Sequence, residues 1–407
     1  MKKVISLLVV LALALGLCSA ALAEGKKTIT FWDGNWNEET FKTIQEMWNA
    51  ENPDIELVGE FQVDNGMTDK YMLALSNNTA PDVMACALDW VTTFGNANLL
   101  YPLDEFIAAD GVDTAQYVQG AIQASTIGGK LYGLPFRSET YALFYNKDML
   151  AEAGYTEPPK SWDEVKEIAA ACTKDDAAGY GLCGANYGNF SFQYITMLRC
   201  HGSDILTADK TASNLTSPEA VEAAKLYVDL KEYAPASVME NSNVENRTLF
   251  TSGKVAMYLS GIYDLDLIIQ GNPDLNFGCA LVPTKSGTDA DRTTILGGWS
   301  VAIPAGCKDP ETAWKFVNFL TRSDVAAVYT NTFTGTQEPA AKFAQYDAAL
   351  VQPHQEALTY AQALQSVAKI TNIRQAIFDN LQLALTGDLT AEEAIAETSA
   401  AVDGLLK

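Results

Sequence analysis

Two acid–aromatic pairs stand out among the residues that could contact a ligand. Trp32-Asp33 ends one apolar segment near the start of the chain, and Asp89-Trp90 follows another. A carboxylate accepts charge-assisted hydrogen bonds from hydroxyl groups, whereas an indole ring offers a flat apolar face. A carbohydrate presents both hydroxyls and an apolar C–H face, so these pairs predict a carbohydrate site. The structural alternative is that the tryptophans belong to the core and that Asp33 caps a helix.

A charged triplet raises a second question. The segment LYGLPFRSETYALFYNKDML (131–150) reads as one long extended run, yet Arg137, Ser138 and Glu139 interrupt it. Burying charges is costly unless they are paired or face a bound molecule. The triplet therefore predicts internal partners or a ligand.

Further candidates lie in glycine-punctuated segments and on one helix. Paired glycines permit a sharp turn or a close approach of the backbone to a ligand. An arginine on an apolar helix face is either a ligand contact or a surface ion-pair partner. The candidates are Asn35 beside Trp36, then Tyr187, Asn189, Phe192, Tyr263, Gly297, Gly298, Trp299 and Arg374.

Sequence patterns of common enzymes are absent. The chain contains no GxSxG, no P-loop, no HExxH and no GxGxxG after a strand. Glycoside hydrolysis needs only two carboxylates, which Asp33, Asp89 and Glu139 could supply. Nothing in the sequence fixes their separation, so a glycosidase stays an alternative.

Alternating strand and helix patterns must position these residues. Apolar periodicity predicts strands at 27–34, 55–61 and 82–88, with helices at 39–50 and 70–76 between them. Such alternation is typical of parallel βαβ units, whose ligands lie beyond the carboxyl ends of the strands.

Helix-start signals dominate the rest of the chain. Capping boxes begin at Ser161 and Thr390, and prolines at the first helical position follow Ser217 and Asp309. We predict the α/β class, with two lobes that each contain a doubly wound, mainly parallel sheet.

The first residues indicate export. Lys2 and Lys3 precede an apolar stretch at 4–17, and Ala21-Leu22-Ala23 fits a cleavage site, so a signal peptide over 1–23 is expected, with cleavage after Ala23. The alternative is a lipid anchor on Cys18, although Leu17 before it fits that pattern poorly.

Charge and cysteine content limit the partners. The formal charge is −24, and −26 once Lys2 and Lys3 are removed, which disfavours nucleic acid and anionic membranes. Six cysteines lie beyond the signal peptide, without close pairs and with only two histidines, so no metal site and no cofactor are expected. Most should be buried apolar residues, and one disulfide among Cys172, Cys183 and Cys200 stays open.

Taken together, these segments resemble a known family. The chain is similar to the solute-binding proteins of ABC importers, in the carbohydrate-binding group that includes maltose-binding proteins. The resemblance covers the whole mature chain through ITFWDG, APDVMACALDW, LLYPLDEFI, GKLYGLPFRSETYALFYNKDML, PPKSWDEV, FTSGKVAMYLSGIYD, GGWSVAIPAG and ALTGDLTAEEAI, in that order.

The resemblance implies two lobes with a ligand cleft between them. The first lobe would comprise 24–136 and 282–330, and the second 137–281 and 331–407. LPFRSET would cross between lobes, a second crossing would lie near 279–284, and a third within 324–337. Hinges of this kind absorb closure while the lobes stay rigid. The implied partners of a monomer are a sugar and the membrane permease.

Individual roles also follow from the resemblance. Asp89 and Trp90 match positions that hydrogen-bond and stack on the sugar. Other matches are crossing carboxylate Glu139, stacking Tyr263, the contact loop Gly297–Trp299, and first-strand contacts Trp32, Asp33 and Asn35. Tyr187, Asn189 and Phe192 align loosely, and Arg374 lies where some relatives carry an aromatic residue.

Two departures limit the transfer. TGTQEPA at 334–340 replaces a glycine-leucine-proline run, and Cys86 replaces an aromatic residue of some maltose binders, so maltose specificity does not carry over. We expect a non-enzymatic binder of a mono- or short oligosaccharide that serves a permease. A polyamine or a glycerol phosphate is the alternative ligand.

Overall fold

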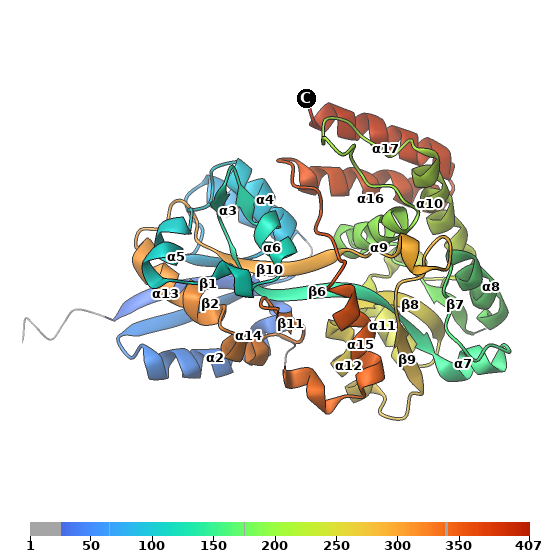
Figure 1. The fold of residues 1–407 in the computed structure, drawn as a ribbon, viewed down its shortest axis with the longest axis horizontal. Coiled ribbons are helices and arrows are strands. Elements are labelled where there is room, and N and C mark those ends of the chain that lie inside the picture. The colour runs from blue at the N-terminus through green and yellow to red at the C-terminus, as the bar shows by residue number, and fades with distance from the viewer. Residues whose placement is uncertain (1–25, 65, 175, 338–340) are drawn as a thin grey trace, which may run out of the picture.

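The protein consists of two α/β lobes side by side, joined by strands that run between them (Figure 1). The computed structural model describes residues 26–64, 66–174, 176–337 and 341–407. The predicted signal peptide and Cys18 lie outside the described residues. Within the described ranges no helix combines the length and the hydropathy needed to cross a membrane.

The first lobe contains the predicted strand–helix alternation. Its elements are β1 (Lys27–Gly34), η1 (Asn35–Asn37), α2 (Glu38–Glu51), β2 (Ile55–Gln62), α3 (Met67–Ser76), β3 (Val83–Ala87), α4 (Leu88–Asn96), α5 (Asp104–Asp110), η2 (Thr114–Gln116), α6 (Gln119–Ala124), β4 (Thr126–Ile127), β5 (Lys130–Leu131), β10 (Leu296–Ala302), α13 (Pro310–Leu320) and α14 (Ser323–Tyr329). Each of the five elements predicted before residue 90 is found within a few residues of its expected bounds.

The second lobe begins with the long crossing strand β6 (Leu134–Asn146). Its other elements are α7 (Lys147–Glu152), α8 (Trp162–Cys172), β7 (Ala178–Gly181), α9 (Tyr187–Cys200), α10 (Pro218–Asp229), η3 (Leu230–Tyr233), η4 (Val238–Glu240), α11 (Asn243–Thr251), β8 (Val255–Gly261), α12 (Tyr263–Gly271), β9 (Phe277–Ala280), η5 (Asp289–Asp291), β11 (Phe333–Thr334), η6 (Ala341–Gln345), α15 (Ala348–Ala357), α16 (Ile370–Thr386) and α17 (Ala391–Leu405).

One sheet runs through both lobes in the order β2-β1-β3-β10-β6-β8-β7, with β9 and β11 also paired to β6. The pairs β1–β2, β1–β3 and β7–β8 are parallel, as βαβ units require. The strands around the crossing, β10 and β6, pair antiparallel with their neighbours. The parallel parts therefore lie at the two ends of the sheet, and the antiparallel strands join the lobes.

Each lobe has its own hydrophobic core, and β6 contributes to both. Phe136 belongs to the first core, whereas Tyr141 belongs to the second. The chain returns later than predicted, because Ile295 still lies in the second core and Trp299 lies in the first. The second crossing is therefore β10 rather than 279–284, and the proposed boundary at 282 falls too early. Between β9 and β10 the chain stays on the second lobe, where the backbone N–H of Trp162 donates to the Thr284 carbonyl.

Near the predicted third crossing, Tyr329 lies in the first core and Phe333 packs with residues of the second lobe. The chain then contacts the first lobe again, because the Gly335 carbonyl accepts from Val118 N and Gln337 N donates to the Gln116 carbonyl. A crossing within 324–337 therefore stays a prediction. The remaining lobe boundaries stay predictions.

Helix caps follow the predicted signals. Ser161 and Thr390 begin capping boxes, and Ser217 and Asp309 cap helices with proline in the first turn. All six described cysteines are free, so the disulfide alternative is wrong. Cys172, Cys183 and Cys200 lie against different partners, namely the Met149 carbonyl, the Asn243 side chain and the Thr293 carbonyl.

Candidate ligand-binding site

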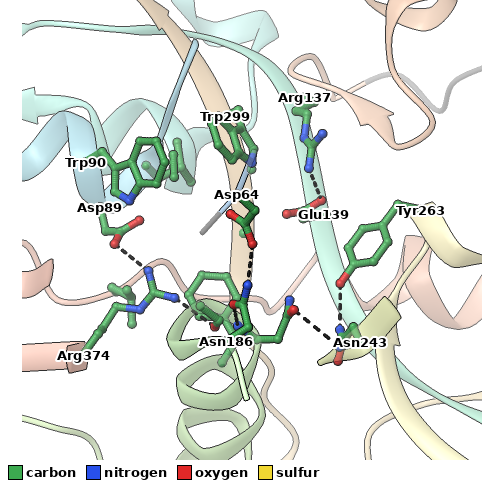
Figure 2. A pocket seen from close by; sticks show the side chains of 18 of the residues that line it. Asp64, Asp89, Trp90, Arg137, Glu139, Asn186, Asn243, Tyr263, Trp299 and Arg374 are labelled. Atoms are coloured by element: carbon green, nitrogen blue, oxygen red, sulfur yellow. Dashed lines mark hydrogen bonds and ion pairs between the residues drawn. The ribbon is translucent and has the colours of Figure 1, made fainter. Parts of the chain in front are cut away.

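A cavity of ≈ 380 Å³ lies between the lobes, with side chains from both around it (Figure 2). Thirteen of the sixteen residues predicted from the sequence line this cavity. They are Asn35, Asp89, Trp90, Arg137, Glu139, Tyr187, Asn189, Phe192, Tyr263, Gly297, Gly298, Trp299 and Arg374. Trp32, Asp33 and Ser138 lie outside it.

The crossing strand β6 supplies one end of the cavity with an ion pair. Arg137 Nη2 donates to Glu139 Oε2 at 3.0 Å, and both side chains are buried. Alternation along the strand points residues 137 and 139 to one face and Ser138 to the other. Arg137 and Glu139 thus pair with each other and also face the cavity, whereas Ser138 Oγ is buried without a hydrogen-bond partner in the described residues. Arg137 Nε is buried and has no hydrogen-bond partner in the described part of the chain.

The paired glycines lie inside β10, where they pair with β6, so the alternative of a sharp turn is wrong. Gly298 has φ 143°, and a Cβ there would lie 2.5 Å from the Arg137 carbonyl oxygen. A Cβ on Gly297 would lie 2.9 Å from Glu139 Cγ. The glycines therefore let β10 approach β6 closely, which brings Trp299 beside Arg137.

Three indole rings form a continuous aromatic wall. The Trp299 ring contacts Trp90 at 5.1 Å and Trp36 at 5.2 Å between centroids, both edge to face. The Arg137 guanidinium carbon lies 5.5 Å from the centroid of the Trp299 ring. Flat apolar rings beside hydrogen-bonding groups are what the C–H and O–H faces of a polyhydroxylated ligand require.

A second ion pair joins the lobes. Arg374 Nη1 on α16 donates to Asp89 Oδ2 at the start of α4 at 2.6 Å. Arg374 also donates to Ser191 Oγ at 3.0 Å and to the Gly188 carbonyl at 2.9 Å, and it lies 4.3 Å from the Phe192 ring centroid. Both charged side chains are buried, so the predicted alternative of a surface ion pair is wrong.

Further polar contacts close the same side of the cleft. Asn186 Nδ2 donates to Asp64 Oδ2 at 2.5 Å, and the hydroxyls of Thr68 and Tyr187 lie 3.0 Å apart. Asn186 has φ 59°, in the left-handed region that asparagine tolerates better than most residues, and it caps α9. The two lobes are therefore in contact around the ligand-sized space.

A hydrogen-bond network orients Tyr263 on the opposite side. Asn243 Nδ2 donates to the hydroxyl oxygen of Tyr263 at 2.9 Å (Figure 2). It also donates to the hydroxyl oxygen of Tyr141 at 3.2 Å. Burial, followed by the carboxylates of Asp264 and Glu139, raises the pKa of the Tyr263 hydroxyl. That hydroxyl therefore stays neutral and keeps a proton to donate.

Asp33 and Trp32 have structural roles. Asp33 is fully buried and accepts hydrogen bonds from Gly34 N at 2.7 Å, Asn37 Nδ2 at 2.8 Å and Tyr329 Oη at 2.6 Å. Burial raises the pKa of Asp33 against these bonds. Trp32 packs on Tyr71, with Lys70 Nζ over its ring. The structure thus favours a structural interpretation for this pair, in which Asp33 holds the turn before α2.

Among the lining residues that sequence reasoning missed are Asp64, Asn243 and Arg247. Asp64 follows the carboxyl end of β2, so the rule that selected Asp89 also selects it. Asn243 and Arg247 lie on α11, whose capping box at Ser242 and Glu245 is a recognisable start signal. Within the described residues no cluster of three His, Cys, Asp or Glu side chains could hold a metal ion.

Known proteins resemble this chain in sequence and structure. The family model of bacterial extracellular solute-binding proteins matches residues 34–327. A binding protein of Brucella abortus (strain 2308) is 30% identical over 294 residues, which cover 71% of this chain and 70% of that protein.

Two solved structures extend the comparison. An ABC transporter solute-binding protein from Thermotoga lettingae TMO, with bound α-D-tagatose, is 28% identical with a TM-score of 0.83, over 94% of this chain and 100% of that one. The GacH receptor of Streptomyces glaucescens GLA.O, solved unliganded and with acarbose, is 26% identical with a TM-score of 0.81, over 94% and 98%. The family predicted from the motifs is confirmed, and the chain belongs to the bacterial extracellular solute-binding proteins.

Proposed function

We propose that this protein captures a neutral sugar or polyol between its lobes and delivers it to the permease of an ABC importer. The observation that carries the proposal is the cavity in which the rings of Trp90 and Trp299 lie beside Asp89 and Glu139. Its volume of ≈ 380 Å³ falls at the lower end of the range for small-molecule sites. Tagatose and acarbose in the related structures support this class of ligand.

The balance of charge favours a neutral ligand. Asp89 and Glu139 are ion-paired with Arg374 and Arg137, so a polyamine would compete with arginines for the carboxylates. A phosphate would need converging cations, and these two arginines already have carboxylate partners. A ligand hydroxyl can instead join either pair without a net change in buried charge.

The same pairing argues against the glycosidase alternative. Hydrolysis needs one carboxylic acid that donates a proton to the leaving group. Asp89 and Glu139 instead accept hydrogen bonds from arginine, and Asp64 accepts one from Asn186. We therefore propose binding without chemistry, by an exported monomer whose signal peptide is cleaved after Ala23. The family is extracellular, which agrees with export.

Thermal unfolding of the chain from Glu24 onward tests this proposal. The panel contains neutral sugars, mannitol, spermidine and glycerol 3-phosphate. A ligand that binds only the folded state raises the midpoint by mass action, and we expect the rise with a sugar or polyol. A rise only with spermidine or glycerol 3-phosphate would overturn the ligand class, and release of reducing sugar from oligosaccharides would overturn the non-enzymatic assignment.

Single variants then test the cavity. Trp299→Ala and Asp89→Ala should each weaken binding of the identified sugar by about tenfold or more, since an unsatisfied buried partner costs roughly 1–3 kcal/mol. Trp32→Phe is the matched control, because Trp32 lies outside the cavity and should leave the affinity unchanged. Calorimetric titration gives the dissociation constants, and unchanged affinity in both cavity variants would remove these residues from the site.

A further inference from the structure

Exposed apolar side chains gather at the mouth of the cavity. Trp36, Val244 and Leu267 line it while remaining 39%, 51% and 40% exposed. The side chains deeper in the cavity are almost fully covered, with Trp90 4% and Trp299 8% exposed. Single exposed apolar residues are ordinary on a protein surface, but three around one opening mark a contact surface.

Both lobes contribute to this rim. Trp36 lies in η1 of the first lobe, whereas Val244 on α11 and Leu267 on α12 belong to the second. Leu267 lies four residues after Tyr263, so the two share one face of α12. Val244 follows Asn243, whose amide donates to the Tyr263 hydroxyl at 2.9 Å. The rim therefore continues directly from side chains that line the cavity.

The aromatic wall is also continuous from the interior to the rim. The Trp36 ring contacts Trp299 at 5.2 Å, and Trp299 contacts Trp90 at 5.1 Å. Lobe-to-lobe contacts elsewhere around the cavity are polar, such as Asp64 with Asn186 and Asp89 with Arg374. The apolar rim is thus a distinct part of the opening, where a ligand can extend outward over rings and methyl groups.

We infer that Trp36, Val244 and Leu267 form a second subsite, which binds a second ring of the ligand. The inference rests on the proposed function and narrows it. The physiological ligand is then a neutral glycoside of at least two units, and not a free monosaccharide or an acyclic polyol. The first unit occupies the polar interior beside Asp89 and Glu139, and the flat apolar face of the next unit covers the rim.

The test is calorimetric titration of the chain from Glu24 onward. The probes are maltose, cellobiose, lactose and sucrose, their constituents glucose, galactose and fructose, then tagatose, mannitol and phenyl β-glucoside. We expect a disaccharide to bind at least about tenfold tighter than its constituents. Trp36→Ala should weaken binding of that disaccharide by roughly three- to tenfold, the range of one aromatic contact.

Val244→Ser and Leu267→Ser separate the rim from effects through Trp299, which Trp36 contacts. Both variants should lower the affinity for the disaccharide more than the affinity for its constituent monosaccharides. The matched controls are Val328→Ser and Leu383→Ser, two residues that are 41% exposed and do not line the cavity, and these should change nothing. Wild type should also bind phenyl β-glucoside more tightly than glucose. Loss of this difference in affinity in the rim variants would support the subsite.

Three outcomes count against the inference. A monosaccharide or mannitol as the tightest ligand, insensitive to all rim variants, would overturn the subsite and leave the proposed function standing. Equal losses for mono- and disaccharide in the rim variants would overturn it as well. If no sugar or polyol bound at all, the proposed function itself would fail, and the subsite with it.

Discussion

Buried charged and titratable side chains lie at and beneath the cavity, and each depends on very few partners. Arg137 has Glu139, and Arg374 has Asp89 together with Ser191 and Gly188. Removing one partner of a buried pair leaves the other charge uncompensated, which costs more than the pair itself contributes. Single substitutions here should therefore act strongly on binding.

His354 gives the pH dependence of stability a specific source. Its ring is fully buried on α15, where Nδ1 donates to the Thr140 carbonyl at 3.2 Å and the ring lies 5.4 Å from Phe144. Burial lowers the pKa of His354 to about 4, although the Thr140 contact opposes this shift. Because the unfolded pKa is about 6.5, the folded chain binds fewer protons. The stabilisation is then complete above about pH 6.5 and is lost as the pH falls towards 4.

We predict that His354→Gln flattens the fall in the free energy of unfolding between pH 7 and pH 4.5. The full shift corresponds to a contribution on the order of 3 kcal/mol. Urea unfolding at several pH values measures the free energy of unfolding of each protein. The contribution of the carboxylates is the same in wild type and variant, so it cancels in the difference between them. The chain's only other histidine, His201, is partly buried, so His201→Gln is the control and should flatten the curve less. Parallel curves for wild type and His354→Gln would contradict the prediction.

Residue types and strand positions predicted thirteen of the residues that line the cavity. Asp89, Trp90 and Glu139 were found because strand ends and charged triplets have few structural explanations. Asp33 was predicted as a ligand contact because the local sequence is the same whether a carboxylate at the end of a strand faces a ligand or holds a turn. The distinction depends on Tyr329, whose hydroxyl lies 2.6 Å from it and which is almost 300 positions away in the sequence.

At the scale of elements, helix starts place polar side chains at the cavity. Asp89 lies in the first turn of α4, Asn186 caps α9, and Asn243 begins α11. A capped N-terminus has a fixed direction, because the cap satisfies backbone N–H groups that would otherwise seek other acceptors. A rigid helix start therefore holds its side chain in a well-defined position relative to a ligand.

Two capping boxes allow a matched prediction. Ser242 N donates to Glu245 Oε2 at 2.8 Å next to Asn243, whereas the box of Ser161 and Glu164 begins α8 and does not line the cavity. Ser242→Ala and Ser161→Ala should each lower the free energy of unfolding by about 1 kcal/mol. Only Ser242→Ala should also weaken ligand binding, since it loosens the start of α11.

Urea unfolding and calorimetric titration measure the two effects. Equal affinities in both variants, despite similar losses of stability, would show that the start of α11 does not position the site. The sequence reveals such caps readily, because Ser or Thr followed three residues later by Glu is a local pattern. It does not reveal that Gly297 and Gly298 lie within a strand, since that depends on the close approach of β6.

At the scale of the molecule, contacts between lobes hold the cleft closed. The bond from Asn186 to Asp64, the pair Thr68–Tyr187 and the ion pair Asp89–Arg374 all join residues of different lobes. Such contacts stabilise the closed state and not either lobe alone. Their effect should therefore be visible in how slowly a ligand leaves.

We predict that Asp64→Ala raises the dissociation rate of the bound sugar by roughly two- to tenfold, the range of one net hydrogen bond. The unfolding midpoint without ligand should change little, because Asp64 is exposed. Stopped-flow tryptophan fluorescence can follow release. Asp209→Ala is the control, since this exposed carboxylate accepts hydrogen bonds from Thr207 and Thr211, which lie on the same lobe. Equal rates in all three proteins would rule out a closing role for Asp64.

The order of the motifs along the chain predicted the two-lobed architecture, but it did not predict the position of the second crossing between the lobes. The loop between β9 and β10 carries no strong periodicity, and only the cores show that Ile295 and Trp299 belong to different lobes. Local patterns predict elements, whereas the lobe of an irregular segment depends on partners distant in the chain.

The last two helices complete a core that begins some 230 residues earlier. α16 and α17 lie on the second lobe beside α9 and α10 (Figure 1), and Ile377 and Val402 share a core with Tyr141 and Leu259. During synthesis from the N-terminus, this core cannot close until α17 has been made. The apolar interior of the second lobe therefore stays incomplete until α16 and α17 are available to pack on it.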